Sequence, residues 1–352
     1  MTVTIGVDIG GTKVAAGLVD EDGQILAKAR RDTPSHDPDL VEEVIADVVR
    51  ELAAGHDVTA VGIGAAGLVD AARATVLFAP NLAWRNEPLR AAVEKRCGLP
   101  VVVENDANAA AWGEARFGAG HGAPYLVMLT VGTGLGGGIV LNGDLYRGRL
   151  GIAAEIGHMI VEPDGRRCGC GNQGCWERYA SGTALVREAQ ELATISPVLA
   201  TRMLEISGGR AERITGLAVT QAAQEGDEAA LEAFAVVGRW LGHGMAALAA
   251  ALDPGVFVLG GGVSEAGALL RDPVVQAFAE RLTASGYRDA PEVRLAELGQ
   301  DAGIVGAADL ARSPAAKEPP AAKEPPAAKE APAAKEAPAA EEPPAAVSPE
   351  PG

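Results

Sequence analysis

The chain has 352 residues, of which 48% are hydrophobic and 22% charged, so it is long enough to bury a large core and form two domains. Its 47 acidic and 30 basic side chains leave a net charge of −17, which argues against a general nucleic-acid-binding protein because there is no basic excess to displace counterions. The N-terminus lacks a secretory pattern, and no apolar run reaches membrane-spanning length. We therefore expect a cytoplasmic protein.

The first third of the chain predicts a meander followed by alternating helices and strands. Three short strands, VTIGVDIG, KVAAGLVD and QILAKARR, are separated by the turns GGT and EDG, the pattern of antiparallel neighbours. Apolar residues at helical spacing predict a helix over residues 39–52. A strand over 58–67, a helix over 86–98, a strand over 100–106 and a helix over 107–118 complete the unit.

The same opening returns in the second half. Residues 125–148 form another predicted pair of strands around a glycine-rich turn, and a long helix near residues 228–252 precedes the strand GVFVLGGG. Two halves with the same opening predict a duplicated fold with a cleft between them. From residue 313 the chain is a repeat of AAKEPP and AAKEAP with nothing to bury, so residues 313–352 are predicted to be a disordered tail.

Three glycine-rich loops follow predicted strands: DIGGT at residues 8–12, TVGTGLGGG at 130–138 and LGGGVSE at 259–265. Glycine lets backbone amides approach a phosphate, and Asp8 adds a carboxylate for Mg²⁺. None of the loops has Walker A spacing, and each alone is also the pattern of a simple turn. Together they favour a split phosphate clamp. Ser264 stands where a helix could begin, which would suit a nucleotide at a helix N-terminus.

Three of the four cysteines lie within eight positions, at 168, 170 and 175. Three thiolates cannot complete a tetrahedral zinc shell, and His158 is the nearest upstream candidate for the fourth ligand. A disulfide between Cys168 and Cys170 would be strained, and a redox pair is normally spaced by two residues. We predict a structural Zn²⁺ held by His158, Cys168, Cys170 and Cys175.

These motifs in combination, with EIGH at residues 155–158 and the ending DAGIVGAADL, resemble the ROK family of sugar kinases, most closely its bacterial, actinobacterial-type glucokinases. The resemblance covers about residues 3–312. It implies an α/β fold of two ribonuclease-H-like domains, of the actin and hexokinase type, flanking a cleft. We expect residues 1–118 with 303–312 to form the N-terminal domain, and residues 119–302 to form the C-terminal domain with the zinc site.

The resemblance implies phosphorylation of glucose at its 6-hydroxyl by ATP. Such a transfer needs a carboxylate to accept the hydroxyl proton, and the family pattern gives this role to Asp106. A simple helix N-cap is the alternative role for Asp106. The predicted sugar ligands are Gly67, Asn81, Asn105, Asp106, Glu155, His158 and Glu177.

The nucleotide is expected to lie against the glycine loops, with Mg²⁺ oriented by Asp8. The predicted cofactor-binding residues are Asp8, Gly10, Gly11, Thr12, Lys13, Thr133, Gly134, Gly261 and Gly262. Lys13 stands at a strand start, where a lysine is more often simply solvated. If one ring nitrogen of His158 binds zinc, the other carries a proton and donates in a fixed direction. Zinc would then orient a sugar ligand without touching the reaction.

Three other functions stay open: a sugar-responsive repressor of the same family, a kinase for another hexose or N-acetylmannosamine, and an actin-like ATPase. Repressors carry a helix-turn-helix ahead of the kinase-like part, and we expect none here because DIGGT begins at residue 8. The zinc cluster beside EIGH argues against a pure ATPase. We expect glucose and ATP as ligands, no nucleic-acid or membrane partner, and a homo-oligomer, either a dimer or a tetramer. The exact sugar range, polyphosphate as donor, regulatory partners and any role of the tail are open.

Overall fold

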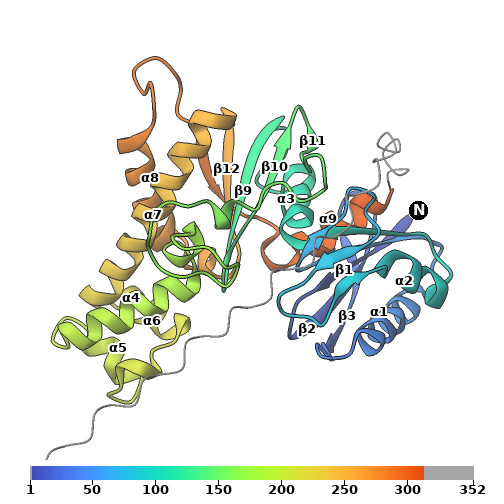
Figure 1. Cartoon of the computed structure of the whole chain (residues 1–352), viewed down its shortest axis with the longest axis horizontal. Helices are drawn as coiled ribbons and strands as arrows, with labels where there is room; N and C mark the ends of the chain where they lie inside the picture. Colours follow the sequence, from blue (N-terminus) through green and yellow to red (C-terminus); the bar gives the residue numbers. More distant parts are fainter. Residues whose placement is uncertain (1, 313–352) are drawn as a thin grey trace, which may run out of the picture. The chain divides into compact units, whose positions relative to one another are not determined.

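The computed structural model describes residues 2–312 (Figure 1). The predicted tail, residues 313–352, lies outside the described residues. A five-stranded mixed sheet organises the first part of the chain, in the order β3-β2-β1-β4-β8. Its strands are β1 (Val3–Ile9), β2 (Lys13–Val19), β3 (Ile25–Asp32), β4 (Val58–Ala65) and β8 (Val101–Asn105).

A second five-stranded sheet has the order β11-β10-β9-β12-β13. Its strands are β9 (Tyr125–Val131), β10 (Leu135–Leu141), β11 (Asp144–Leu145), β12 (Val256–Gly260) and β13 (Glu292–Leu295). In both sheets the first three strands in this order pair antiparallel, and the remaining pairings are parallel. The repeated order confirms the prediction of a duplicated α/β fold.

A small antiparallel sheet follows β4, made of β5 (Leu68–Val69), β6 (Val76–Phe78) and β7 (Arg85–Glu87). The helix predicted over residues 86–98 is therefore shorter than expected. It begins after Pro88, as α2 (Leu89–Cys97), because the residues before it pair with β6. Pro88 cannot donate a backbone hydrogen bond, which suits the boundary between strand and helix.

Helix α1 (Pro38–Ala53) matches the predicted amphipathic segment and packs on β2 and β3. Asp37 caps it by accepting from the backbone N–H of Leu40 at 3.2 Å, and Pro38 occupies the first helical position. Its apolar face, which includes Val41, Ile45, Val48 and Leu52, is buried. This face completes one side of the first hydrophobic core.

The helices of the second half are α4 (Gly182–Ile195), α5 (Thr201–Ile206), α6 (Gly216–Gln224), α7 (Glu228–Leu252) and α8 (Ala268–Arg281). Of these, only α7 is predicted from the sequence pattern. Ser181, Thr215 and Asp227 each accept a hydrogen bond from the third residue after them, which starts α4, α6 and α7. Helix α8 is harder to foresee because it contains Pro273.

Helix α7 corrects one expectation from the sequence. Among the described residues it is a helix long and apolar enough to cross a membrane, although half of its most apolar stretch is buried. It packs along α8 and against α4 and α6, and its buried face includes Phe234, Val237, Leu241 and Met245. Its apolar character is therefore that of a core helix.

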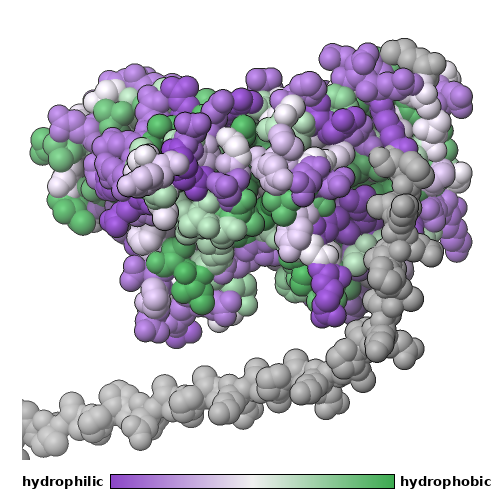
Figure 2. Space-filling model, turned by 90° about the horizontal axis from the view of Figure 1, so that it is seen from above, coloured by the Kyte–Doolittle hydropathy of each residue, from purple (hydrophilic) through white to green (hydrophobic). Residues whose placement is uncertain are grey.

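On the face of the molecule in Figure 2, hydrophobic residues lie among hydrophilic ones, as on most protein surfaces.

The final helix, α9 (Ala302–Arg312), packs on β1 and β4 of the first sheet and on α3 (Asp106–Phe117) (Figure 1). Glycine permits this contact. A Cβ added at Gly6 would lie 1.8 Å from the carbonyl oxygen of Ile304, and one at Gly62 would lie 1.8 Å from that of Ala307. These contacts support our proposal that residues 303–312 belong to the N-terminal domain.

We predict that Gly62→Ala lowers the free energy of unfolding by about 3 kcal/mol, the upper end of overpacking costs, because the new methyl group meets backbone rather than a flexible side chain. Gly286→Ala is the matched control, since a Cβ there meets nothing within 4 Å. Denaturant unfolding followed by circular dichroism measures both variants. Equal stabilities of the two variants would show that α9 is not closely seated on β4.

Candidate active site

The turn from β8 into α3 places Asn105 and Asp106 side by side. Asn105 is the helix N-cap, because its Oδ1 accepts from the N–H of Asn108 at 2.9 Å. Asp106 is instead the first helical residue, and its Oδ1 accepts from the N–H of Ala107 and from Nδ2 of Asn105. The capping role considered for Asp106 therefore belongs to Asn105. This leaves the Asp106 carboxylate available for chemistry.

The environment of Asp106 disfavours negative charge. Burial raises its pKa to about 7, with further contributions from the charges of Asp8 and Glu155. Burial also raises the pKa of Asp8 to about 6, against the opposing charge of Lys13. Several carboxylates thus share one poorly solvated region. A carboxyl group with a pKa near neutral pH is suited to accept a proton at that pH.

Helix α3 brings Asp106 to the second sheet as well. It contacts β4 and β8 of the first sheet and β9 and β10 of the second. A Cβ added at Gly136 would lie 3.1 Å from Cβ of Ala107, and one at Gly138 would lie 2.3 Å from Cβ of Ala111. Small residues on both sides thus let the first turns of α3 lie directly on β10.

The first glycine loop joins β1 to β2 and follows Asp8, whose charge acts on Asp106. Gly10 donates its N–H to the carbonyl oxygen of Lys13 at 3.0 Å, and Lys13 begins β2 as predicted. A Cβ on Gly11 would lie 2.9 Å from Cβ of Asn81, so the loop passes close to this exposed asparagine. Thr12 is exposed at the tip of the turn. Among the predicted phosphate ligands of this loop, Thr12 is therefore exposed, whereas Gly10, Gly11 and Lys13 are half-buried.

The second and third loops meet each other. Gly261, with φ +81°, lies against the backbone of Val131. A Cβ added at Gly261 would lie 2.6 Å from the carbonyl oxygen of Val131. The start of α4 also holds the second loop, because the hydroxyl of Thr183 donates to the carbonyl oxygen of Thr133 at 2.6 Å. The contact between Gly261 and Val131 brings the segment that contains Thr133 and Gly134 close to Gly261 and Gly262.

Ser264 does not start an α-helix, which corrects the expectation. Residues Gly262–Ala266 form a short 3₁₀-helix, and the Ser264 hydroxyl donates to the carbonyl oxygen of Gly261 at 2.7 Å. Helix α8 begins only at Ala268. The hydroxyl therefore closes the glycine turn instead of capping a longer helix.

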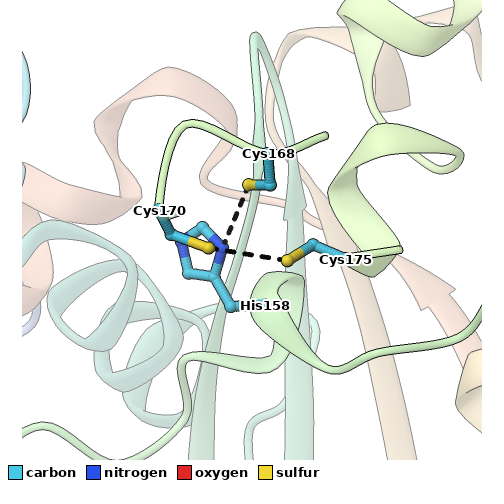
Figure 3. A group of neighbouring side chains, drawn as sticks. All are labelled: His158, Cys168, Cys170 and Cys175. Carbon is cyan, nitrogen blue, oxygen red and sulfur yellow. Dashed lines mark hydrogen bonds between the residues drawn. The ribbon is translucent and has the colours of Figure 1, made fainter. Parts of the chain in front are cut away.

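The four predicted zinc ligands converge (Figure 3). Their ligand atoms all lie within 4.8 Å of one another. Sγ of Cys170 and Cys175 are 3.6 Å apart, and Sγ of Cys168 is 3.7 Å from Nδ1 of His158. Bonds of about 2.3 Å to sulfur in a tetrahedral shell place ligand atoms roughly 3.8 Å apart. The cluster therefore fits a zinc ion without rearrangement of the chain.

His158 also borders the predicted sugar ligands. Its Nδ1 faces the cysteines, whereas its Nε2 lies 4.0 Å from Oε2 of Glu155. Glu177 accepts from Sγ of Cys168 at 2.9 Å, and a Cβ added at Gly134 would lie 2.7 Å from its other oxygen. Burial raises the pKa of Glu155, and nearby Glu177 adds to this effect. The predicted zinc ligands thus lie next to Glu155 and Glu177.

Gly67 has a different surrounding from the one expected. A Cβ there would lie 2.4 Å from the carbonyl oxygen of Phe78, so its missing side chain permits packing on β6. Its carbonyl oxygen accepts from Nδ2 of Asn105 at 3.2 Å. Gly67 therefore supports the Asn105 side chain. Asn81 lies near the site because it packs against Gly11 of the first glycine loop.

Sequence reasoning missed two charged residues beneath this site, Glu104 and Arg147. Oε2 of Glu104 lies 2.7 Å from Nε of Arg147. A glutamate inside the buried strand VVVEN was a usable signal, because a buried charge needs a partner. The partner itself carried no such signal, since it comes from a loop 43 positions later in the sequence.

Comparison with known proteins defines the family. The model of the ROK family matches residues 4–313. The chain belongs to the ROK family. This ROK protein is 50% identical over 314 residues to the glucokinase of Streptomyces coelicolor, which covers 89% of this chain and 99% of that protein. The glucokinase of Thermotoga maritima is 39% identical over 311 residues, or 88% of this chain and 96% of that protein.

A solved structure is also similar to this ROK protein. It is a ROK family glucokinase from Streptomyces griseus in complex with glucose and AMPPNP. The TM-score is 0.82 at 54% sequence identity, over 88% of this chain and 99% of that chain. The similarity confirms the predicted fold class, that of ROK sugar kinases.

We predict that Cys170→Ser reduces bound zinc from about one ion per chain to near zero, because one of four ligands is lost. The dissociation constant for glucose should rise at least about tenfold, since His158 and Glu177 lose their support. Metal analysis and calorimetry give the two readouts.

Cys97→Ser is the control, because Cys97 is a free, half-buried cysteine outside the cluster. It should keep both zinc and glucose affinity. Full zinc retention by Cys170→Ser would remove Cys170 from the ligand set. Loss of zinc with unchanged glucose affinity would limit the metal to stabilising its loop.

Proposed function

We propose that this ROK protein transfers the γ-phosphoryl group of ATP to the 6-hydroxyl of glucose, with Asp106 as general base. The observation that carries this proposal is the Asp106 carboxylate, placed where both sheets meet α3 and held by burial at a pKa of about 7. Glucose and ATP as the substrates are supported by a glucokinase that is 50% identical to this protein and by a similar structure that contains glucose and AMPPNP.

Asp106 accepts the proton of the attacking hydroxyl as the new bond to phosphorus forms. Its Oδ1 is fixed by Ala107 and Asn105, so the carboxylate has a set direction before the sugar arrives. Positioning of this kind lowers the barrier by removing the entropy cost of aligning base and hydroxyl. Asn105 itself is fixed by Gly67.

The other sugar hydroxyls are assigned to Glu155, His158 and Glu177, and to Asn105, with Asn81 and Gly67 at the border of the site. The side chains of the first three are 42%, 38% and 22% exposed, so a ligand can reach them. With Nδ1 on the zinc side, Nε2 of His158 carries the proton and donates toward the sugar beside Glu155. The zinc ion would fix this tautomer and takes no part in phosphoryl transfer.

The nucleotide phosphates are assigned to the three glycine loops, at Gly10, Gly11, Thr12, Lys13, Thr133, Gly134, Gly261 and Gly262. Asp8 would hold the Mg²⁺ of the nucleotide. Burial raises the pKa of the half-buried Asp8 carboxyl to about 6, against the opposing charge of Lys13, which fits a group that binds a cation. When bound, Mg²⁺ neutralises charge on the transferring phosphoryl group.

A cytoplasmic enzyme that acts on free glucose, and that assembles as a dimer or tetramer, remains our proposal for location and assembly. The low cysteine count and the predicted zinc–thiolate cluster support a reducing compartment. Closure of the two halves over the sugar would keep water from the phosphoryl group.

We predict that Asp106→Asn lowers kcat about 10³-fold and leaves the dissociation constant for glucose within about threefold, because the amide keeps the shape but cannot accept the proton. Asp57→Asn, at an exposed aspartate, should keep wild-type kcat. A coupled ATP assay on glucose, mannose, fructose, N-acetylglucosamine and N-acetylmannosamine measures turnover.

Wild-type turnover should be greatest with glucose. A preference for N-acetylmannosamine would make the protein an aminosugar kinase, and no turnover with bound zinc would favour a sugar-sensing role. Undiminished activity of Asp106→Asn would exclude it as the base.

The pH dependence follows from the raised pKa of Asp106. Below about pH 7 the free carboxyl is protonated, and a protonated carboxyl cannot accept the hydroxyl proton. We expect kcat/KM for glucose to be constant above this pH and to fall about tenfold per pH unit well below it. A rate profile that stays flat down to pH 5, with the protein still folded, would contradict an Asp106 base.

A further inference from the structure

Glu104 is a fully buried carboxylate next to the turn from β8 into α3 that carries Asn105 and Asp106, called the catalytic turn below. It lies in β8 directly before Asn105 and is 1% exposed. Its Oε1 accepts from the backbone N–H of Asn105 at 2.9 Å and from Nδ2 of Asn108 at 3.2 Å. The carboxylate thus holds both ends of the turn that presents Asp106.

The other oxygen of Glu104 faces two arginines. Oε2 is 2.7 Å from Nε of Arg147 and 3.2 Å from Nε of Arg73. The pairs are ionic contacts without hydrogen-bond alignment. A buried carboxylate needs such partners, because leaving it alone in the interior is strongly unfavourable. Two cations therefore compete for one oxygen.

Arg147 reaches Glu104 from the second half of the protein. It follows β11, the edge strand of the second sheet, and its side chain is 11% exposed. Its guanidinium donates to the carbonyl oxygens of Asp70 at 2.9 Å and Ala71 at 3.1 Å. All of its contacts named here are thus with the first half of the chain.

The same loop makes a second contact with that turn. Gly151 has a φ of +87°, and a Cβ there would lie 2.6 Å from the carbonyl carbon of Asp70. The loop from Arg147 to Gly151 is therefore seated on the turn between β5 and β6, with Arg147 inserted toward Glu104. It provides a mechanical link between β11 and the base of the catalytic turn.

We propose that Arg147 is a positioning residue for phosphoryl transfer, acting through Glu104 to fix the Asn105–Asp106 turn relative to the second half of the protein. This inference rests on the proposed role of Asp106. Without Arg147, Arg73 is the remaining cation of this pair beside Oε2 of Glu104. The carboxylate then shifts toward Arg73, which weakens the hydrogen bond to the N–H of Asn105. Displacement of a catalytic group by about 1 Å costs up to about 10²-fold in rate.

Arg147→Met tests the proposal, with Arg149→Met as the matched control, since Arg149 is an exposed arginine in the same loop. We expect kcat of Arg147→Met to fall about 10- to 100-fold, with KM for glucose and ATP within about threefold. Arg149→Met should match the wild type. Thermal unfolding and circular dichroism of each variant allow kcat to be expressed per folded enzyme.

Two further variants separate positioning from simple packing. Arg147→Lys keeps the charge but not the fork, so it should remain folded with an intermediate kcat. Glu104→Gln should lower kcat, and in the Arg147→Met background it should add little, because both changes break one link. If Arg147→Met does not fold, the Lys variant and Glu104→Gln still give the comparison.

The proposal is overturned if Arg147→Met and Arg147→Lys lose only thermal stability while kcat per folded enzyme stays at the wild-type value. It is also overturned if the Glu104 and Arg147 effects on kcat multiply as independent changes. Asp106→Asn, measured in parallel, distinguishes the two levels. An inactive Asp106→Asn with an unaffected Arg147→Met rejects only this inference, whereas an active Asp106→Asn rejects the assignment on which it rests.

Discussion

The close seating of α3 against both sheets is the constraint on which the candidate site depends. Small residues make it possible. Gly136 and Gly138 of β10 lie against Ala107 and Ala111, and a Cβ at Gly64 of β4 would lie 3.5 Å from Cβ of Ala109. Because α3 is closely packed against both sheets, the half-buried Asp106 at its start is poorly solvated. The same burial that raises its pKa suits it to accept a proton at neutral pH.

Behind this turn, two different devices hold the polar groups of the site. In our proposal, a zinc ion on the cluster would set the direction of His158, whose Nε2 lies 4.0 Å from Oε2 of Glu155. Glu177 lies between this cluster and Gly134. A buried ionic contact, Glu104 with Arg147, holds the base side. In both cases a set of buried or half-buried polar side chains lies one layer behind the groups that meet the ligand, which is how precise sites are usually supported.

Much of this arrangement could be predicted from the sequence, and the failures have physical causes. Strand alternation, the length of α7 and the spacing of the three cysteines with His158 are local patterns, so one chain segment reveals each. Helix α6 has only nine residues, three of them alanine, and Pro273 lies inside α8, which weakens the periodic signal. The pairing of Arg147 with Glu104 depends on how distant segments meet, and no local pattern encodes it.

The most direct test of the account is a crystal structure of this protein with glucose and a non-hydrolysable ATP analogue. We predict a carboxylate oxygen of Asp106 within about 2.6–3.2 Å of the glucose 6-hydroxyl, the reach of a general base, with that hydroxyl facing the γ-phosphoryl group. A 6-hydroxyl bound by another side chain, with Asp106 beyond hydrogen-bond distance in the closed complex, would contradict it.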